Sequence, residues 1–357
     1  MDSLETLHQL IEQEIKESQI PGANYALVFA DKILLGSAGK RAILPEVEEN
    51  TIDTIYDMAS LSKVVATTTA ILQLLEQGRL RLQTKVKTYL PHFQHDSITI
   101  WHLLTHTSGL PEGVKGLMSM QSADEVWQQI YETQLSYETG MRIHYSDIGF
   151  ILLGKIVEVI TGMPLEVYTK QSIFAPLDMK DTGYNPKQKE RCAPTEYRNN
   201  ALYQGVQRGV VHDETAYLLG GVAGHAGLFS TIEDCSHFIQ MILNQGIYQG
   251  KTILHPQTID RLFQPEVEMH QGVVLHEVMR SLGWMVGGLG GPNGDLTSSQ
   301  TIHHTGFTGT SIFIDRAHGV GFCLLTNRVH PTRENTHHID MRGRIANYVM
   351  THYQKLS

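Results

Sequence analysis

Hydrophobic residues recur at helical spacing at the start of the chain, and the pattern then changes to strand-like runs. One apolar stripe predicts an amphipathic helix over residues 3–18, which Pro21 and Gly22 end. Its members are Leu4, Leu7, Ile11 and Ile15. Apolar runs at residues 24–30 and 33–39 flank a polar Asp-Lys pair, so we expect a β-hairpin there.

Helical patterns dominate the middle of the chain, and strand composition returns near its end. The predicted helices span about 60–77, 100–104, 123–131, 146–160, 165–173 and 232–243. Strands are expected at 282–286, 301–304, 310–314 and 321–326, before a last helix at 335–353. Because strands lie at both ends, we expect an α+β fold in which one antiparallel sheet is built from both termini and flanked by helices.

The same pattern predicts two subdomains. Residues 1–62 and 265–357 would form the α/β sheet subdomain, and residues 63–264 an inserted, mostly helical one. The active site is expected in the cleft between them. A chain of 357 residues is long enough for this arrangement.

Composition removes several classes of function. The chain is 41% hydrophobic and 18% charged, as in ordinary globular proteins. Its net charge of −9 and its lack of long basic runs argue against a nucleic-acid partner. Cys192, Cys235 and Cys323 are too scattered for a disulfide framework, so we expect reduced, structural thiols.

Membrane and cofactor signals are weak. The N-terminal residues lack the basic and apolar regions of a signal peptide, and no apolar run approaches membrane-spanning length. We therefore expect a cytoplasmic protein with no membrane partner. The glycine-rich stretches at 220–227 and 287–294 lack the context of nucleotide-binding loops, so no cofactor is expected. The sequence carries no signal for an oligomeric state.

One stretch combines a nucleophile with a nearby amine. Ser60 lies where a short strand at Ile55 meets a helix, and its backbone N–H would face outward at the helix N-terminus. Lys63 follows one turn later on the same face, where an amine can take the hydroxyl proton. The alternative is a helix cap beside a solvated lysine. Ser37 and Lys40 share the spacing, but on a strand they point to opposite faces.

Two further segments carry candidate chemistry. Tyr145 stands just before a predicted helix, where a phenol can project into a cleft and shuttle a proton; alternatively, it only packs at a helix start. His304, Thr305 and Gly306 end a predicted strand before Phe307. Backbone N–H groups there can help to hold an oxyanion, although an ordinary strand end has the same pattern.

Taken together, these segments resemble the three motifs of the serine β-lactamase-like family. The motifs are Ser60-Leu-Ser-Lys63, Tyr145-Ser-Asp147 and His304-Thr-Gly306, which match S-x-x-K, Y-x-N and [KH]-T-G in order and broad spacing. The family includes class C β-lactamases, penicillin-binding D-alanyl-D-alanine carboxypeptidases, esterases and D-amino-acid peptidases. The resemblance runs from about residue 10 to the C-terminus and implies a β-lactamase/transpeptidase-like fold.

The resemblance also implies roles for the residues. Ser60 would form the acyl-enzyme, and Lys63 and Tyr145 would share its proton. The backbone N–H groups of Ser60 and Phe307 would hold the oxyanion. The substrate would be bound by Asp147, His304, Thr305, Gly306 and Phe307. Of these, His304 and Thr305 would bind a carboxylate or carbonyl group of the substrate.

Two positions depart from the family pattern. Asp147 replaces the usual asparagine, and its carboxylate would favour a charged Lys63, which shifts the expected base toward Tyr145 without excluding Lys63. His304 replaces the lysine of most β-lactamases. It would be largely neutral at pH 7, so it would bind a substrate carboxylate more weakly than a lysine does.

A metal site is the main competing interpretation of the nineteen histidines. His102 and His106 have the i, i+4 spacing of zinc ligands, but the glutamate of H-E-x-x-H is missing and a turn follows at once. A structural role is favoured. By the resemblance, His212, Asp213 and His225 would border the cleft.

We therefore expect a serine hydrolase that cleaves ester or amide bonds of small substrates or peptides, including cell-wall fragments, through an acyl-enzyme. β-Lactamase activity should be weak. The alternatives are a β-lactamase or D-alanyl-D-alanine carboxypeptidase, and, from another class, a penicillin-binding sensor that is acylated without turnover.

Overall fold

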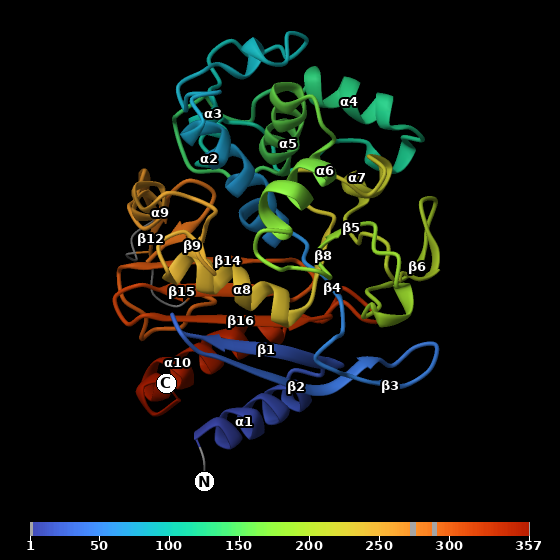
Figure 1. The fold of residues 1–357 in the computed structure, drawn as a ribbon. Helices are drawn as coiled ribbons and strands as arrows, with labels where there is room; N and C mark the ends of the chain where they lie inside the picture. The colour runs from blue at the N-terminus through green and yellow to red at the C-terminus, as the bar shows by residue number, and fades with distance from the viewer. Residues whose placement is uncertain (1–2, 272–275, 288–290, 357) are drawn as a thin grey trace.

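A nine-stranded antiparallel sheet joins the two ends of the chain (Figure 1). The computed structural model describes residues 3–271, 276–287 and 291–356. β1 pairs with β16, with Ala26 opposite Cys323, so the sheet is built from both termini as the sequence predicts. Its strands, in spatial order, are β11 (Val267–Gln271), β12 (His276–Arg280), β13 (Met285–Val286), β14 (Thr301–Thr305), β15 (Ser311–Asp315), β16 (Val320–Thr326), β1 (Gly22–Val28), β2 (Ile33–Ala42) and β3 (Glu48–Glu49).

Each face of the sheet has its own helical cover. α1 (Ser3–Glu17) and α10 (His338–Leu356) lie together on one face, and α8 (Ile232–Leu243) packs on the other (Figure 1). Successive side chains of β1 point to opposite faces of the sheet. Tyr25 and Leu27 pack with α1 and α10, whereas Ala26 and Val28 join the core on the α8 side.

A helical region lies beyond α8 (Figure 1). α5 runs through it with most of its residues buried, which fits its apolar composition. Its elements are η1 (Lys63–Thr68), α2 (Thr69–Glu76), η2 (Val86–Thr88), α3 (Ile100–Leu104), η3 (Leu117–Ser119), α4 (Ala123–Tyr131), α5 (Asp147–Thr161), α6 (Leu165–Thr169), η4 (Lys170–Phe174), η5 (Lys189–Arg191) and α7 (Glu214–Leu218). α9 (Pro256–Leu262) lies instead beside β12 at the edge of the sheet (Figure 1).

Short strands connect the helical region to the sheet. β4 (Tyr56–Asp57) pairs with β8 (Leu228–Ser230), which also pairs with β5 (Gly183–Tyr184). β4 leads directly to Ser60, so this small sheet holds the turn in front of the proposed nucleophile. Two further hairpins are β6 (Tyr197–Asn199) with β7 (Gln204–Val206), and β9 (Ile247–Tyr248) with β10 (Lys251–Thr252).

Several predicted boundaries were wrong. The expected strand at 282–286 is reduced to β13 because Ser281–Gly283 form a turn, and the last helix begins at His338 rather than residue 335. The sequence pattern missed β11 and β12 altogether. The glycine-rich loop predicted at 287–294 lies partly outside the described residues.

The described residues include no single helix that is long and apolar enough to cross a membrane. α5 and the segment 165–174 reach that length only together, and they meet at 77°.

Candidate active site

Ser60 sits on a constrained turn. Ala59, the residue before it, has φ of +46°, a backbone conformation that residues with side chains rarely adopt. Asp57 stabilises the turn because its carboxylate accepts the N–H of Ala59 at 2.8 Å, and the hydroxyl of Ser62 donates to the Ala59 carbonyl at 2.6 Å. These hydrogen bonds thus fix the position of Ser60 relative to the end of β4.

Lys63 is fully buried beside Ser60. Its Nζ donates to Ser60 Oγ at 3.0 Å and to the carbonyl of His225 at 3.1 Å, and it forms an ion pair with Asp147 at 2.7 Å. Two hydrogen-bond acceptors and one carboxylate therefore surround the Lys63 amine. Burial works to lower the pKa of Lys63, but the charges of Asp147 and Tyr145 outweigh it and the pKa is raised. Lys63 is therefore held as a cation.

The helix that carries Lys63 differs from the prediction. Residues 63–68 form a π-helical segment before the regular α2, so a hydrogen bond from Thr69 Oγ1 reaches back five residues to Val64 at 3.1 Å. π-Helical turns are rare and concentrate at functional sites. The predicted helix at 60–77 is therefore present with altered winding at the lysine.

Tyr145 completes the contacts to the nucleophile. Its hydroxyl donates to Ser60 Oγ at 2.8 Å, and its ring lies 4.6 Å from the ring of His106 and 4.8 Å from Lys63 Nζ. Burial raises the pKa of Tyr145, and the charge of Lys63 partly offsets this. His106 supports the segment because its Nδ1 accepts the N–H of Ser146 at 3.1 Å.

The HTG segment lies at the end of β14. His304 is buried, and its ring lies 6.4 Å from that of Tyr145. Its Nδ1 donates to the carbonyl of Thr305 at 2.9 Å. Burial, followed by the charges of Arg280 and Lys63, holds the pKa of His304 well below its usual range, so the ring is neutral.

Gly306 is required where β14 passes the Ser60 turn. A Cβ on Gly306 would meet Thr310 Oγ1, and it would lie 2.6 Å from the Met58 carbonyl. The adjoining loop holds this contact through Thr308 Oγ1, which donates to the Asp57 carbonyl at 2.7 Å, and Thr310 Oγ1, which donates to that of Met58 at 3.1 Å. These contacts hold the His304–Gly306 motif against the turn that carries Ser60.

Two backbone N–H groups are unpaired at this junction. Among the described residues, no acceptor takes the N–H of Ser60 or that of Phe307. Free N–H donors close to a serine hydroxyl can stabilise an oxyanion that develops there.

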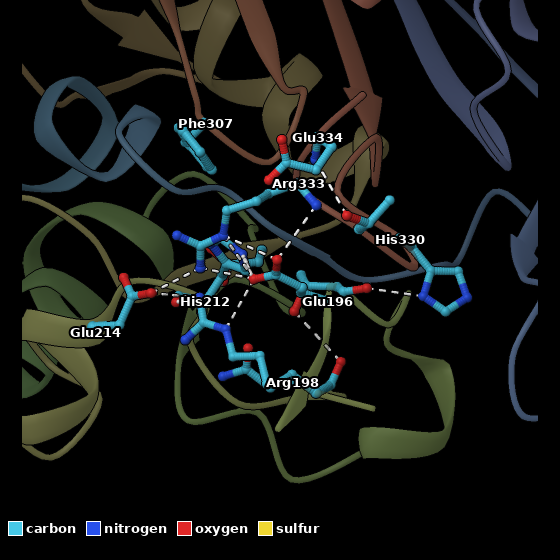
Figure 2. Close-up of polar contacts among 12 residues, drawn as sticks. Glu196, Arg198, His212, Glu214, Phe307, His330, Arg333 and Glu334 are labelled. Atoms are coloured by element: carbon cyan, nitrogen blue, oxygen red, sulfur yellow. Dashed lines mark hydrogen bonds and ion pairs between the residues drawn. The ribbon is translucent and has the colours of Figure 1, made fainter. Parts of the chain in front are cut away.

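A network of charged residues forms one border of the site (Figure 2). Phe307 is half exposed and stacks on His212, with ring centroids 5.6 Å apart. Glu196 binds His212 at 3.1 Å and Arg333 at 2.7 Å, and Arg198 adds a third donor at 3.0 Å. Burial acts to raise the pKa of Glu196, but these hydrogen bonds lower it below its usual range.

Asp213 and His225 lie on the other side of Lys63. His225 Nε2 bonds to Asp213 at 2.7 Å, and the two approach Asp147 closely enough to resemble a metal-ligand group. His225 Nε2 and Asp213 satisfy each other, and Lys63 contacts Asp147 and the His225 carbonyl, so the cluster surrounds the lysine with polar groups.

The residues of all three motifs thus lie close together. Ser60, Lys63 and Tyr145 are in direct contact, and Asp147 touches Lys63. The two histidines of the zinc hypothesis have separate partners: His102 Nδ1 contacts Thr99 at 2.9 Å, and His106 lies against Tyr145.

Sequence reasoning missed two neighbours of Tyr145. For His106 the sequence predicted a structural role rather than a zinc site, with no contact to Tyr145. Arg280, whose guanidinium carbon lies 5.8 Å from the Tyr145 ring centroid, belongs to none of the motifs. The only signal for Arg280 was an isolated charge before the apolar Leu282-Gly-Trp284.

Comparisons with known proteins agree with this geometry. The profile of the Beta-lactamase family matches residues 7–345. An N-acetylmuramyl-L-alanine amidase from Bacillus subtilis (strain 168) is 34% identical over 92% of this chain and 81% of its own. A putative D-alanyl-D-alanine carboxypeptidase from Escherichia coli (strain K12) is 30% identical over 92% of this chain and 83% of its own.

Solved structures share the fold. EstCE1, a hydrolase with promiscuous acyltransferase activity, superposes with a TM-score of 0.75 at 20% identity, covering 97% of this chain and 98% of its own. The fold class expected from the sequence is thereby confirmed. The ordered motifs, the fold and the near-complete family match lead to one conclusion: this chain belongs to the beta-lactamase family and is a serine hydrolase.

Proposed function

We propose that Ser60 is the nucleophile of an amide hydrolase that acts through an acyl-enzyme. The observation that carries the proposal is the position of Ser60 Oγ, which accepts hydrogen bonds from both Lys63 and Tyr145 beside two unpaired N–H groups. A hydroxyl needs an adjacent base to become nucleophilic, and this one has two candidates within reach.

The proposed reaction has two stages. Ser60 Oγ attacks the substrate carbonyl carbon and loses its proton to the base, and the N–H groups of Ser60 and Phe307 stabilise the resulting oxyanion. The C–N bond then breaks, and the base returns the proton to the leaving amine. Water hydrolyses the acyl-enzyme by the same steps in reverse order and restores Ser60.

Tyr145 is the better candidate for the base. Lys63 is paired with Asp147 and its pKa is raised, so it holds its proton and stabilises negative charge on the phenol. In this assignment Lys63 acts as a fixed cation. Asp147 acts on the substrate only through Lys63.

For the substrate, we propose a small cell-wall-derived fragment with an amide bond between a muramyl group and an amino acid. The B. subtilis relative supports this choice because its name describes such an amidase, and it covers 92% of this chain. The E. coli relative suggests a second substrate, a peptide ending in D-alanyl-D-alanine. The cytoplasmic location expected from the sequence stays a prediction, which cell fractionation tests.

The first experiment measures intact-protein mass after incubation with a fluorophosphonate. We expect an adduct on the wild type and none on Ser60→Ala, because the serine oxygen is the attacking atom. Equal labelling of both proteins would contradict the proposal. Thr67→Ala serves as a control, since this buried hydroxyl on the same helix bonds to the Gly224 carbonyl and lies outside the proposed chemistry.

The second experiment separates the substrates. N-Acetylmuramyl-L-alanine, a D-alanyl-D-alanine peptide and a penicillin are each incubated with wild type and Ser60→Ala, and product release is followed. Release of alanine from the muramyl compound supports the amidase. Release from the peptide alone supports the carboxypeptidase, and a persistent penicillin adduct without turnover of any compound supports a sensor.

A further inference from the structure

Arg280 is a buried cation for which the described residues provide no carboxylate partner. It ends β12 and is only 7% exposed, and its Nε and Nη1 have no acceptor among those residues. Burial lowers its pKa to about 10, which still leaves the guanidinium charged at neutral pH. An unpaired buried charge is costly, so its position calls for an explanation.

The guanidinium faces the phenol of the proposed base. Its carbon lies 5.8 Å from the centroid of the Tyr145 ring, and the charge of Tyr145 raises the Arg280 pKa against the effect of burial. Negative charge on Tyr145 is therefore the stabilising partner that the surroundings offer to Arg280.

In the described part of the chain, the other ionisable groups around Tyr145 are neutral or already paired. His106 accepts a backbone N–H at Nδ1, and His304 donates a proton from its own Nδ1. Both have pKa values well below the usual range, because of burial first and then the charge of Arg280. Both rings are uncharged at neutral pH.

Lys63 is a cation, but its charge is shared. Asp147 lies 2.7 Å from Lys63 Nζ and offsets much of the field that the ammonium exerts on Tyr145. Arg280 has no such neighbour among the described residues. Of the two cations, Arg280 is the one whose charge is not cancelled at close range.

We propose that Arg280 is a positioning residue whose buried guanidinium stabilises the negative charge that Tyr145 carries when it serves as the base for Ser60. The inference rests on the proposed function. In this inference Arg280, which lies outside the three motifs, supplies a fixed positive charge beside Tyr145. His304 cannot supply it because its ring is neutral.

The test is the pH dependence of Ser60 acylation by a fluorophosphonate in Arg280→Met and Arg280→Lys. For Arg280→Met, we expect the acidic limb of the rate profile to move up by about one pH unit, because loss of a nearby cation disfavours the phenolate. The rate on that limb should fall about tenfold. Arg280→Lys keeps the charge and should retain most of the rate.

A double-mutant cycle shows whether Arg280 acts through Tyr145. In a Tyr145→Phe background, Arg280→Met should change the remaining rate less than about twofold, because the coupled pair is already broken. The inference would be overturned if the two substitutions lowered the acylation rate independently, so that their effects multiplied in the double variant. It would also be overturned if Arg280→Met lowered the acylation rate equally at every pH. Thermal unfolding of each variant checks folding, and Arg280→Gln replaces Arg280→Met if the latter unfolds.

Failure of the proposed function gives a different result. If Ser60 is not the nucleophile, the wild type forms no Ser60-dependent adduct at any pH. If only the role of Arg280 is wrong, Ser60 is labelled normally and the acidic limb stays in place in Arg280→Met.

Discussion

The side chains around the Ser60 hydroxyl combine one carboxylate with two cations. Asp147 occupies the place of the family's usual asparagine and contacts Lys63 at 2.7 Å. A neutral amide there would leave the lysine free to lose its proton on burial, whereas a carboxylate holds the proton in place. In the proposed mechanism, Asp147 therefore decides which neighbour accepts the proton of Ser60.

Asp147→Asn tests this division of roles. Removing the carboxylate lowers the pKa of Lys63, because burial then acts without the opposing charge. If the ammonium form is the active one, the alkaline limb of the kcat/KM profile should move to lower pH, and activity above neutral pH should fall about tenfold. Glu12→Gln, an exposed carboxylate on α1, is the control. An unmoved limb would assign the alkaline titration to another group.

Residues within the three motifs could be predicted from the sequence because each motif fixes both a local geometry and a chemistry. A serine and a lysine three residues apart at a helix start lie on the same face, and here their side chains meet at 3.0 Å. His106 and Arg280 could not be found in this way. They reach Tyr145 only through the packing of α3 and β12, and no short pattern records such a contact.

At the scale of elements, the decisive contact is the one between the end of β14 and the Ser60 turn. Gly306 lies so close to Met58 that the strand can pass only without a side chain. The hydroxyls of Thr308 and Thr310 lock the same two segments together. This junction holds the two proposed oxyanion donors, the N–H groups of Ser60 and Phe307, in fixed positions relative to each other.

Gly306→Ala should therefore damage both stability and catalysis. The added methyl group would overpack the junction, at a cost of roughly 1–3 kcal/mol in unfolding free energy. Separation of the two N–H groups should lower kcat by a factor on the order of 100. Thermal unfolding and steady-state kinetics measure the two effects. Gly183→Ala is the matched control, because a Cβ there meets nothing within 4 Å.

Element boundaries were predictable where the periodicity was strong. Residues 100–104, 123–131 and 232–243 are helical as expected, since polar N-caps and apolar stripes mark them. The π-helical winding at Lys63 left no sequence signal, and the tertiary contacts of Lys63 to Asp147 and His225 left none either. β11 and β12 were missed because they contain few β-branched residues and no Phe, Tyr or Trp, the composition that marks strands.

At the scale of the whole molecule, the charged network around Glu196 joins distant parts of the chain. Glu196 precedes β6, Glu214 begins α7 and Arg333 follows β16, and they meet beside Phe307 (Figure 2). Such a network stabilises the fold only while its carboxylates are ionised.

Glu196→Gln should destabilise the protein in a manner that depends on pH. The pKa of Glu196 is lowered in the folded state, so its contribution is present above the pKa of an unfolded glutamate and is lost as pH falls through the folded value. We expect a loss of roughly 3–5 kcal/mol near neutral pH, because the arginines lose a buried partner. Urea unfolding at several pH values measures it. Glu49→Gln, an exposed carboxylate on β3, should show no comparable difference, and a pH-independent effect would contradict the expectation.

The pairing of β1 with β16 has a consequence for synthesis. The ribosome makes Ser60 early, but β1 has an open edge until residues 320–326 emerge to pair with it. The loop that closes over the Ser60 turn, at residues 306–310, is also made late. A nascent chain therefore carries the proposed nucleophile long before it carries the second proposed oxyanion donor, and the proposed active site can form only after residues 306–310 have left the ribosome.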